Sequence, residues 1–381
     1  MNRTQKQFSV SARSDNSKLG SVNNTHSHTT NSFDFLRITA ALAVLFSHSF
    51  PIIGLPEPQP IAGQTFGSLA VALFFAVSGF LVCQSWSRDP SLKRFGSRRA
   101  LRIMPGLCVV VLLTALVIGP LFSTLPVRGY FANPKWWQYI PCNLLFISVP
   151  ALPGLFETNP LPFGSNGSLW TLRYEVLMYA WLAFIGSLLP RAKLKHACVA
   201  SFLGFAILWC VLTIGHYAPY QLPFVGRIHM ELYGDQVGSL GAFFFAGSCM
   251  LLYLQRIRLS LLIAALLLSL CVIMPYKNVA MPMLWIAIPY ATISFAYRGP
   301  VMFRKLTGFD YSYGIYIYAF PVQQIVAQWI PDVSHKWFAS FAIATGITVA
   351  LAAMSWYLIE KPALALKPRL SPSEARASVV A

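Results

Sequence analysis

The chain has 381 residues, of which 56% are hydrophobic, 14% aromatic and only 11% charged. This composition excludes an ordinary soluble domain, in which about a quarter of the residues are charged. The formal net charge of +17 would suit nucleic acid, but the basic residues fall in short clusters between apolar runs, where the positive-inside rule expects them. The sequence therefore predicts a polytopic membrane protein with the lipid bilayer, and no nucleic acid, as a partner.

The apolar runs are continuous and lack the alternation of a membrane β-barrel, so they predict an all-α transmembrane helical bundle. Lysine and arginine gather in the connectors on one side of the bundle, which places both termini in the cytoplasm. About ten helices are expected, at 33–53, 68–86, 103–122, 167–189, 196–214, 236–254, 258–274, 279–296, 311–330 and 337–359.

One transmembrane domain, 33–362, is expected between two polar tails. Residues 1–32 are rich in Ser, Asn and Thr and carry no apolar core like that of a signal peptide, so a disordered cytoplasmic tail is expected. Residues 363–381 are a second polar cytoplasmic tail. The seven cysteines include no CxxC pair, so we expect neither a disulfide framework nor a zinc site.

The first apolar run, FDFLRITAALAVLFSHSF, carries Asp34, Arg37 and His48. On an α-helix Arg37 and His48 lie about 20° apart in projection and about 16 Å apart along the axis, so they share a face. The imidazole would then lie near the middle of the membrane. Ionisable side chains at that depth serve as relays, ligands or catalysts, and a structural histidine bonded to a neighbouring helix is an equally weighted interpretation. Asp34 most simply pairs with Arg37, although it can equally position Arg37 for a ligand.

The connector before the third expected helix ends in RFGSRRALRIMP, with Arg98, Arg99 and Arg102 at the start of that helix. Arg99 and Arg102 are spaced to share a face. Guanidinium groups bind phosphate in bidentate fashion, so the pair could hold a phosphorylated ligand arriving from the cytoplasm. Positive-inside anchoring explains most such clusters, and the residues alone favour it.

The fourth expected helix opens with NGSLWTLRYEVLMYAW, which places Arg173 and Glu175 inside an apolar run. Near a histidine, Glu175 could hold the tautomer of that base or carry a proton itself. The alternative is a structural ion pair with Arg173 or with an arginine of another helix.

Two connectors are expected on the outer side. The aromatic residues of 123–166 could contact a sugar ring, although tryptophan at the headgroup level is commoner. The second connector, at about 215–235, contains possible metal ligands, but their irregular spacing favours a solvated loop and no metal is expected. The residues concerned are Trp136, Trp137 and Tyr139 in the first connector and His216, His229, Glu231 and Asp235 in the second.

Five motifs follow one another along the chain. They are Asp-x2-Arg with Arg-x10-His at Asp34, Arg37 and His48, Phe-Phe-x-x-Ser-Gly-Phe within 73–82, an arginine-rich stretch at 98–105, Leu-Trp-Thr-Leu-x-x-Glu at 169–175, and Tyr-x-Ile-Glu-Lys-Pro within 356–362. In this order they resemble the acyltransferase 3 family of integral-membrane O-acyltransferases, many of which modify bacterial surface polysaccharides. In many members the ninth helix contains the motif Ser-Tyr-x-x-Tyr-x-x-His. This chain has Ala319 in place of that histidine, so any function of the histidine in other members is absent here.

The resemblance implies a multi-pass O-acyltransferase of the bacterial inner membrane. It would move an acyl group, with acetyl favoured, from acyl-CoA to a sugar hydroxyl of an exported or cell-surface glycan or glycolipid. The donor phosphates would dock on Arg99 and Arg102, with Asp34 in the same substrate site. Acyl-CoA is a donor substrate, and no cofactor is expected. We expect the outer connector 123–166 to select the acceptor.

The resemblance further implies that His48 is the general base, a role suited to an imidazole. A covalent acyl-histidine intermediate is equally compatible with the sequence. Arg37 would steady the donor, and Glu175 would orient or charge-balance the base.

A transporter or flippase for a lipid-linked or polar solute is the alternative. Its buried His, Glu and Arg residues would form a proton or substrate path. The sequence shows neither the inverted repeat nor the paired interrupted helices typical of many such folds. A non-catalytic assembly subunit is a third interpretation.

Overall fold

The computed structural model describes residues 32–366 except for 62, 148–150, 163, 215–219, 226–227, 275–276, 305–308 and 331–335. Both predicted tails fall almost entirely outside the described residues. The all-α membrane bundle is confirmed, since helices occupy all ten expected positions. Within the described residues, seven helical runs are long and apolar enough to cross a membrane.

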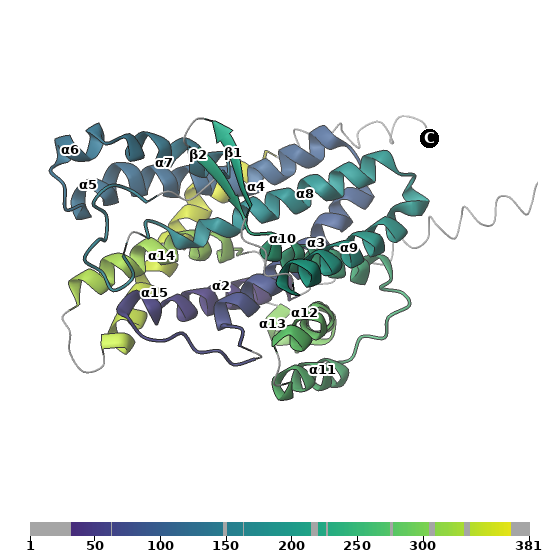
Figure 1. The fold of residues 1–381 in the computed structure, drawn as a ribbon. Coiled ribbons are helices and arrows are strands. Elements are labelled where there is room, and N and C mark those ends of the chain that lie inside the picture. The colour runs from purple at the N-terminus through teal and green to yellow at the C-terminus, as the bar shows by residue number, and fades with distance from the viewer. Residues whose placement is uncertain are drawn as a thin grey trace, which may run out of the picture.

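The transmembrane region is a helical bundle, with α11 and α12 at one edge and α6 and α7 at another (Figure 1). The helix α3 lies against α2 and α10, and α14 lies against α2 and α15. The main helices are α2 (Phe33–His48), α3 (Phe66–Arg88), α4 (Leu92–Leu113), α8 (Trp170–Leu188), α9 (Leu194–Ile214), α10 (Gly234–Leu252), α11 (Leu261–Ile273), α12 (Lys277–Arg298), α14 (Ser312–Trp329) and α15 (Lys336–Ser355). Shorter helices are η1 (Pro51–Ile53), η2 (Thr114–Ile118), α5 (Gly119–Phe122), α6 (Val127–Ala132), α7 (Pro134–Leu144), η3 (Gly167–Leu169), η4 (Arg191–Lys193), α13 (Val301–Arg304), η5 (Trp356–Glu360) and α16 (Lys361–Leu364).

Two glycines allow α3 and α10 to pack backbone to backbone. A Cβ at Gly79 would lie 1.7 Å from the carbonyl oxygen of Phe244, and one at Gly247 would lie 2.0 Å from that of Ala76. The Ser248 hydroxyl also donates to the Gly79 carbonyl at 3.0 Å. Small residues are the usual means of close helix approach in membranes.

The third expected helix begins earlier than predicted, because α4 starts at Leu92 rather than at 103. Leucine, lysine and arginine are good helix formers, so the stretch before Pro105 continues the helix toward the N-terminus. The arginine cluster therefore lies on a helix, which fixes the relative positions of Arg99 and Arg102.

The outer connector 123–166 is partly helical, and its aromatic residues mostly serve packing. Tyr130 and Tyr139 are fully buried. The Tyr130 hydroxyl and the Trp136 indole donate to the Ala115 carbonyl at 2.9 and 3.2 Å. Ala115 belongs to the π-helical segment η2, where the backbone pattern changes. Trp137, with 67% of its surface exposed, is the aromatic residue of this group that suits the membrane interface.

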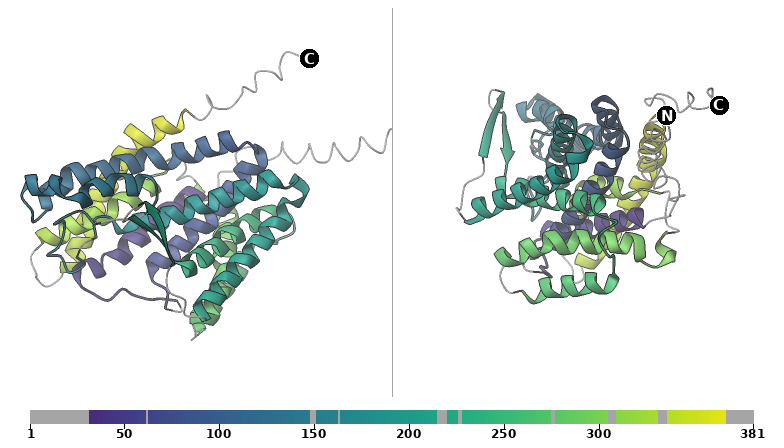
Figure 2. Two further views of the ribbon diagram at one scale, coloured as in Figure 1. Left: turned by 45° about the horizontal axis from the view of Figure 1, so that its top comes forward. Right: turned by 90° about the vertical axis from the view of Figure 1, so that its right-hand side faces the viewer.

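A β-hairpin occupies part of the connector that we expected to be a solvated loop. Strands β1 (Tyr220–Val225) and β2 (Ile228–Leu232) pair antiparallel, with Tyr220 opposite Leu232. The right-hand view of Figure 2 shows the hairpin standing apart from the helices. It joins the end of α9 to the start of α10.

Candidate functional site

A cavity of about 290 Å³ reaches from the arginine-rich end of the bundle to its middle. We call it the donor-side cavity. It lies between α2, α3, α4, α8 and α14. Its charged and aromatic lining includes Arg37, Arg99, Arg102, Glu175, Asp310, Phe74, Phe75, Tyr179, Tyr313, Tyr316 and Trp356.

Asp310 joins two of the cavity's arginines. Its Oδ2 atom lies 2.5 Å from a guanidinium nitrogen of Arg37 and 2.5 Å from one of Arg102. The Ser312 hydroxyl donates to the other carboxylate oxygen, and Glu360 lies 4.0 Å from Arg102. Burial alone would raise the pKa of Asp310, but Arg102 and Arg37 hold it at about 2. Two of the predicted ligand-binding arginines thus share one carboxylate of the protein itself.

Arg99 differs from its neighbours because it has no ion pair among the described residues. Its guanidinium carbon lies 5.8 Å from the ring centroids of both Phe95 and Tyr179. Its Nε atom is buried without a hydrogen-bond partner in the described part of the chain. A half-buried guanidinium with unused donors favours an anionic ligand.

Arg94 and Arg98, on the same helix, have a partner outside the cavity. Asp89 accepts hydrogen bonds from both, at 2.5–2.8 Å. These bonds hold the pKa of the Asp89 carboxyl well below its ordinary value. Arg94 and Arg98 are therefore anchoring arginines outside the cavity, whereas Arg99 and Arg102 line it. Among the described arginines of the cluster, Arg99 alone has no ion pair with an acid.

Glu175 lies inside the donor-side cavity. The Ser78 hydroxyl donates to it at 3.2 Å, and the Tyr179 hydroxyl donates to the same oxygen. Tyr179 also packs on Arg99, so the carboxylate lies in the environment of that cation. The Glu175–His48 pairing that we considered is not formed in this structure.

His48 lies beyond the cavity, at the other end of α2. Its ring packs edge-on against Phe320, with centroids 5.5 Å apart and planes at 82°. Its Nδ1 atom is buried and has no hydrogen-bond partner among the described residues. Arg37 lines the cavity and His48 does not, because their axial separation of about 16 Å exceeds the reach of the cavity along α2.

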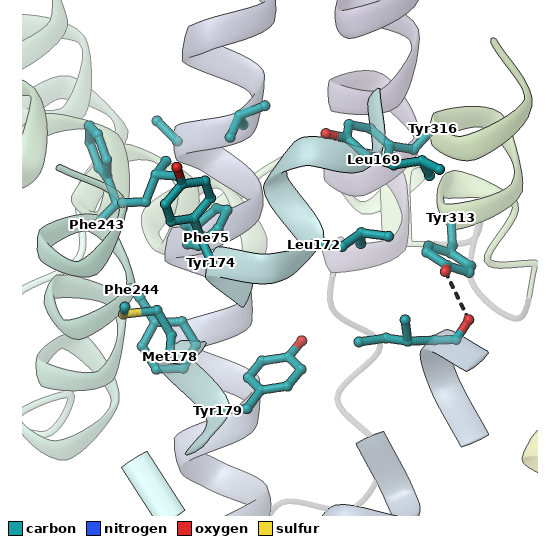
Figure 3. Close-up of a cluster of buried hydrophobic side chains, with 14 of the residues drawn as sticks. Phe75, Leu169, Leu172, Tyr174, Met178, Tyr179, Phe243, Phe244, Tyr313 and Tyr316 are labelled. Atoms are coloured by element: carbon teal, nitrogen blue, oxygen red, sulfur yellow. Dashed lines mark hydrogen bonds between the residues drawn. The ribbon is translucent and has the colours of Figure 1, made fainter. Parts of the chain in front are cut away.

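The helices α8 and α14 lead from the cavity to His48. Thr171 and Tyr316 line the cavity and share a hydrogen bond of 2.6 Å between their hydroxyls. One turn farther along each chain, a Cβ at Gly167 would lie 2.6 Å from the Phe320 ring. Figure 3 shows the start of this wall, with Leu169 and Leu172 pointing toward Tyr313 and Tyr316. Phe320 thus packs against His48 one turn beyond Tyr316, the last residue of α14 that lines the cavity.

Part of the outer connector is fixed over the same end of α14. The Asn166 side chain donates to the Ile317 carbonyl at 2.8 Å. The Asn159 side chain donates to Gln324 at 2.7 Å, and Gln324 donates to the Leu161 carbonyl at 2.9 Å. This end of the connector therefore frames the surroundings of His48.

The structure brings four of the six predicted site residues into one cavity: Arg37, Arg99, Arg102 and Glu175. Asp34, in the first turn of α2, does not line it. Asp310 was not predicted, although an acid directly before the tyrosine-rich ninth helix was a usable signal. Tyr313 of that helix both lines the cavity and packs against α4, since its hydroxyl donates to the Ile103 carbonyl at 2.8 Å.

Comparisons with known proteins agree with these motifs. A family model described as an acyltransferase domain matches residues 30–357. An O-acetyl transferase of Shigella phage Sf6 is 30% identical over 352 residues, which cover 90% of this chain and 99% of that protein. Nodulation protein 10 of Rhizobium leguminosarum bv. viciae is 29% identical over 379 residues, with 92% and 98% covered. No solved structure matches the chain.

Proposed function

The chain belongs to the acyltransferase 3 family of membrane O-acyltransferases, and we propose that it moves an acetyl group from acetyl-CoA to a sugar hydroxyl of an exported or cell-surface glycan. Acetyl is favoured by the relative named O-acetyl transferase. The arginine-rich end of the bundle is taken as cytoplasmic, in a bacterial inner membrane, where acetyl-CoA is available. Acyl transfer takes precedence over the transporter alternative because the family is enzymatic.

The main support for the donor is the position of Arg99. Its guanidinium lines the cavity at the cytoplasmic end and has no acidic partner among the described residues. We propose that Arg99 is the main ligand of the donor phosphates. Arg102 adds positive charge to the site while it stays paired with Asp310. Arg37 holds Asp310 from the other side. The pantetheine arm would then extend along the cavity toward Thr171 and Tyr316.

In the proposed reaction, His48 accepts the proton of the sugar hydroxyl as the oxygen attacks the thioester carbonyl. The carbon–sulfur bond breaks, an oxygen ester forms, and the leaving thiolate of CoA takes the proton from the imidazolium. Transfer through an acyl-imidazole on His48 gives the same two products. Either route requires the Phe320 ring to move aside so that the thioester meets the imidazole.

Glu175 has a place in this scheme on the donor side. Its hydrogen bonds from Ser78 and Tyr179 fix the carboxylate beside the cavity. There it lies within the electrostatic reach of Arg99 without forming an ion pair with it. In this scheme Glu175 does not orient the imidazole of His48.

Acetyl transfer from isotope-labelled acetyl-CoA tests the proposal. Membranes that contain the chain and matched membranes without it are incubated with the donor and a crude cell-surface glycan extract, then separated into protein, lipid and glycan fractions. Label that enters glycan or glycolipid only with the chain supports the proposal. Binding of labelled donor without any transfer, across extracts from several bacterial sources, would contradict it.

A further inference from the structure

A second cavity, of about 320 Å³, lies in the bundle away from the arginines. We call it the outer cavity. Its lining includes two tryptophans, an acid, two amides and a hydroxyl: Trp170, Trp209, Asp235, Gln64, Gln236 and Ser68. A few polar groups among aromatic side chains are typical of small-ligand sites, and the volume is within their range.

The helix ends around this cavity place it on the outer side. The helices α3, α8 and α10 begin here and α9 ends here. The opposite ends of these helices carry the basic residues, with Arg88 closing α3 and Arg191 between α8 and α9. By the positive-inside rule, the outer cavity then opens away from the cytoplasm.

The helix α8 separates the two cavities. Its Tyr174 and Met178 point toward Phe243 and Phe244 of α10, whereas Leu172 points toward α14 (Figure 3). Trp170 lies on the same side of α8 as Tyr174, since the centroids of their rings are 5.6 Å apart. The side chain that lines both cavities is Val71 of α3. The cavities therefore meet at Val71, in the second turn of α3.

The outer cavity is also near His48 through α3. Ser68 lines the cavity, and its neighbour Gly67 donates its backbone N–H to the Ser47 hydroxyl at 2.7 Å. Ser47 directly precedes His48. The outer cavity is therefore one helix, α3, away from the end of α2 that carries His48.

The lining does not suit a phosphorylated ligand. Among the described residues no lysine or arginine lines the outer cavity, so nothing there neutralises phosphate. Asp235 has no ion pair in the described part of the chain and is bonded only weakly, by the Gln236 amide at 3.4 Å. Carboxylate and amide groups together accept and donate hydrogen bonds to hydroxyls, and tryptophan offers an apolar face beside a polar N–H.

We propose that the outer cavity binds a neutral sugar ring of the acceptor, with Trp170 and Trp209 against the ring and Asp235 on its hydroxyls. This inference rests on the proposed function and places the specificity for the acceptor on α8, α9 and α10. It moves acceptor selection away from the connector 123–166, where we first expected it.

Binding of methyl glycosides tests the inference without the donor. The full chain in lipid nanodiscs is titrated with methyl glycosides of glucose, galactose, mannose, rhamnose and N-acetylglucosamine, and intrinsic tryptophan fluorescence is recorded. We expect at least one glycoside to bind, with a Kd that Asp235→Asn raises about tenfold because a charged hydrogen bond is lost. Glu157→Gln is the matched control, since Glu157 is an exposed outer acid that bonds Thr124. No binding by the wild type, or equal Kd values for the two variants, would overturn the inference.

A second arm separates this inference from the proposed function. The KM of the glycan acceptor and the KM of acetyl-CoA are measured for Trp170→Ala and for the exposed control Trp137→Ala. We expect only Trp170→Ala to raise the acceptor KM, with the donor KM unchanged. If Trp170→Ala transfers acetyl with an unchanged acceptor KM, the proposed sugar site is wrong and the proposed reaction stands. If the chain binds a glycoside but transfers no acetyl group, the sugar site is supported and the proposed reaction is contradicted.

Discussion

Phe320 lies edge-on against His48, with ring centroids 5.5 Å apart. The same ring leaves no room for a side chain at Gly164 or Gly167, where a Cβ would approach it to 3.0 and 2.6 Å. Glycines at these positions let the ring fill the space between the imidazole and the inner end of the donor-side cavity. In the proposed reaction this contact would set the order of events, because the thioester would reach His48 only after Phe320 moves.

Replacing Phe320 by alanine should open this path to water. We expect Phe320→Ala to increase hydrolysis of acetyl-CoA in the absence of acceptor about tenfold, and to lower stability by about 3–5 kcal/mol as a buried ring is lost. Phe338→Ala is the control, because Phe338 is 66% exposed on α15. Hydrolysis and thermal melting in detergent are the measurements. A hydrolysis rate equal to that of the control would show that the ring is only packing.

Arg99 should contribute to donor binding more than its neighbours. We expect Arg99→Ala to raise the KM for acetyl-CoA about tenfold, as expected for loss of one charged hydrogen bond, and to leave kcat nearly unchanged. Arg94→Ala is the matched control, since Arg94 pairs with Asp89 outside the cavity. Steady-state kinetics at two salt concentrations measure the effect. Equal KM values for the two variants would contradict donor binding by Arg99 and indicate that it only anchors the helix at the membrane surface.

The bridge through Asp310 should make stability depend on acid pH. Its pKa falls from 3.8 to about 2 on folding, so its contribution of about 2 kcal/mol is complete above the unfolded pKa and disappears as the pH falls from about 4 to 2. We expect Asp310→Asn to lower the melting temperature at pH 7, because two buried guanidinium groups lose their partner. The variant should also show a smaller decrease on acidification. Melting curves parallel to the wild type at every pH would contradict the bridge.

Glu175 should not set the pH dependence of catalysis. It lies eight residues, or about 12 Å, along η3 and α8 from Gly167, which marks the level of the Phe320–His48 contact. We therefore expect Glu175→Gln to change the KM for acetyl-CoA while the pH at which kcat/KM is half-maximal stays at the wild-type value. A shifted pH profile would instead place the carboxylate beside His48 during the reaction.

Periodic and compositional features of the sequence predicted the fold well. Ten apolar runs correspond to ten helices, because a continuous run long enough to span hydrocarbon satisfies its backbone only as a helix. The cavity's polar residues were also found, since Arg37, Arg99, Arg102 and Glu175 interrupt apolar helices. Such residues are costly there and so mark functional positions.

Long-range pairings could not be predicted in the same way. Arg102 was expected to bind phosphate, but its partner Asp310 lies 208 residues away, and no local spacing connects the two. The shared face of Arg37 and His48 was a correct projection, yet projection says nothing about where a cavity ends along the axis. The outer cavity was missed because five separate helices supply its lining, and Asp235 was assigned to a loop.

The central claim is that His48 is the catalytic residue of acyl transfer, as general base or as acyl carrier, and its replacement tests this most directly. Transfer of labelled acetyl to glycan is measured for wild type, His48→Ala, His48→Gln and the exposed control His196→Ala, at matched membrane levels. The account predicts that both His48 variants lose about 10²–10⁴-fold in kcat, with the KM for acetyl-CoA unchanged and His196→Ala fully active. Transfer by His48→Ala at near the wild-type rate would contradict it and make the histidine a structural residue.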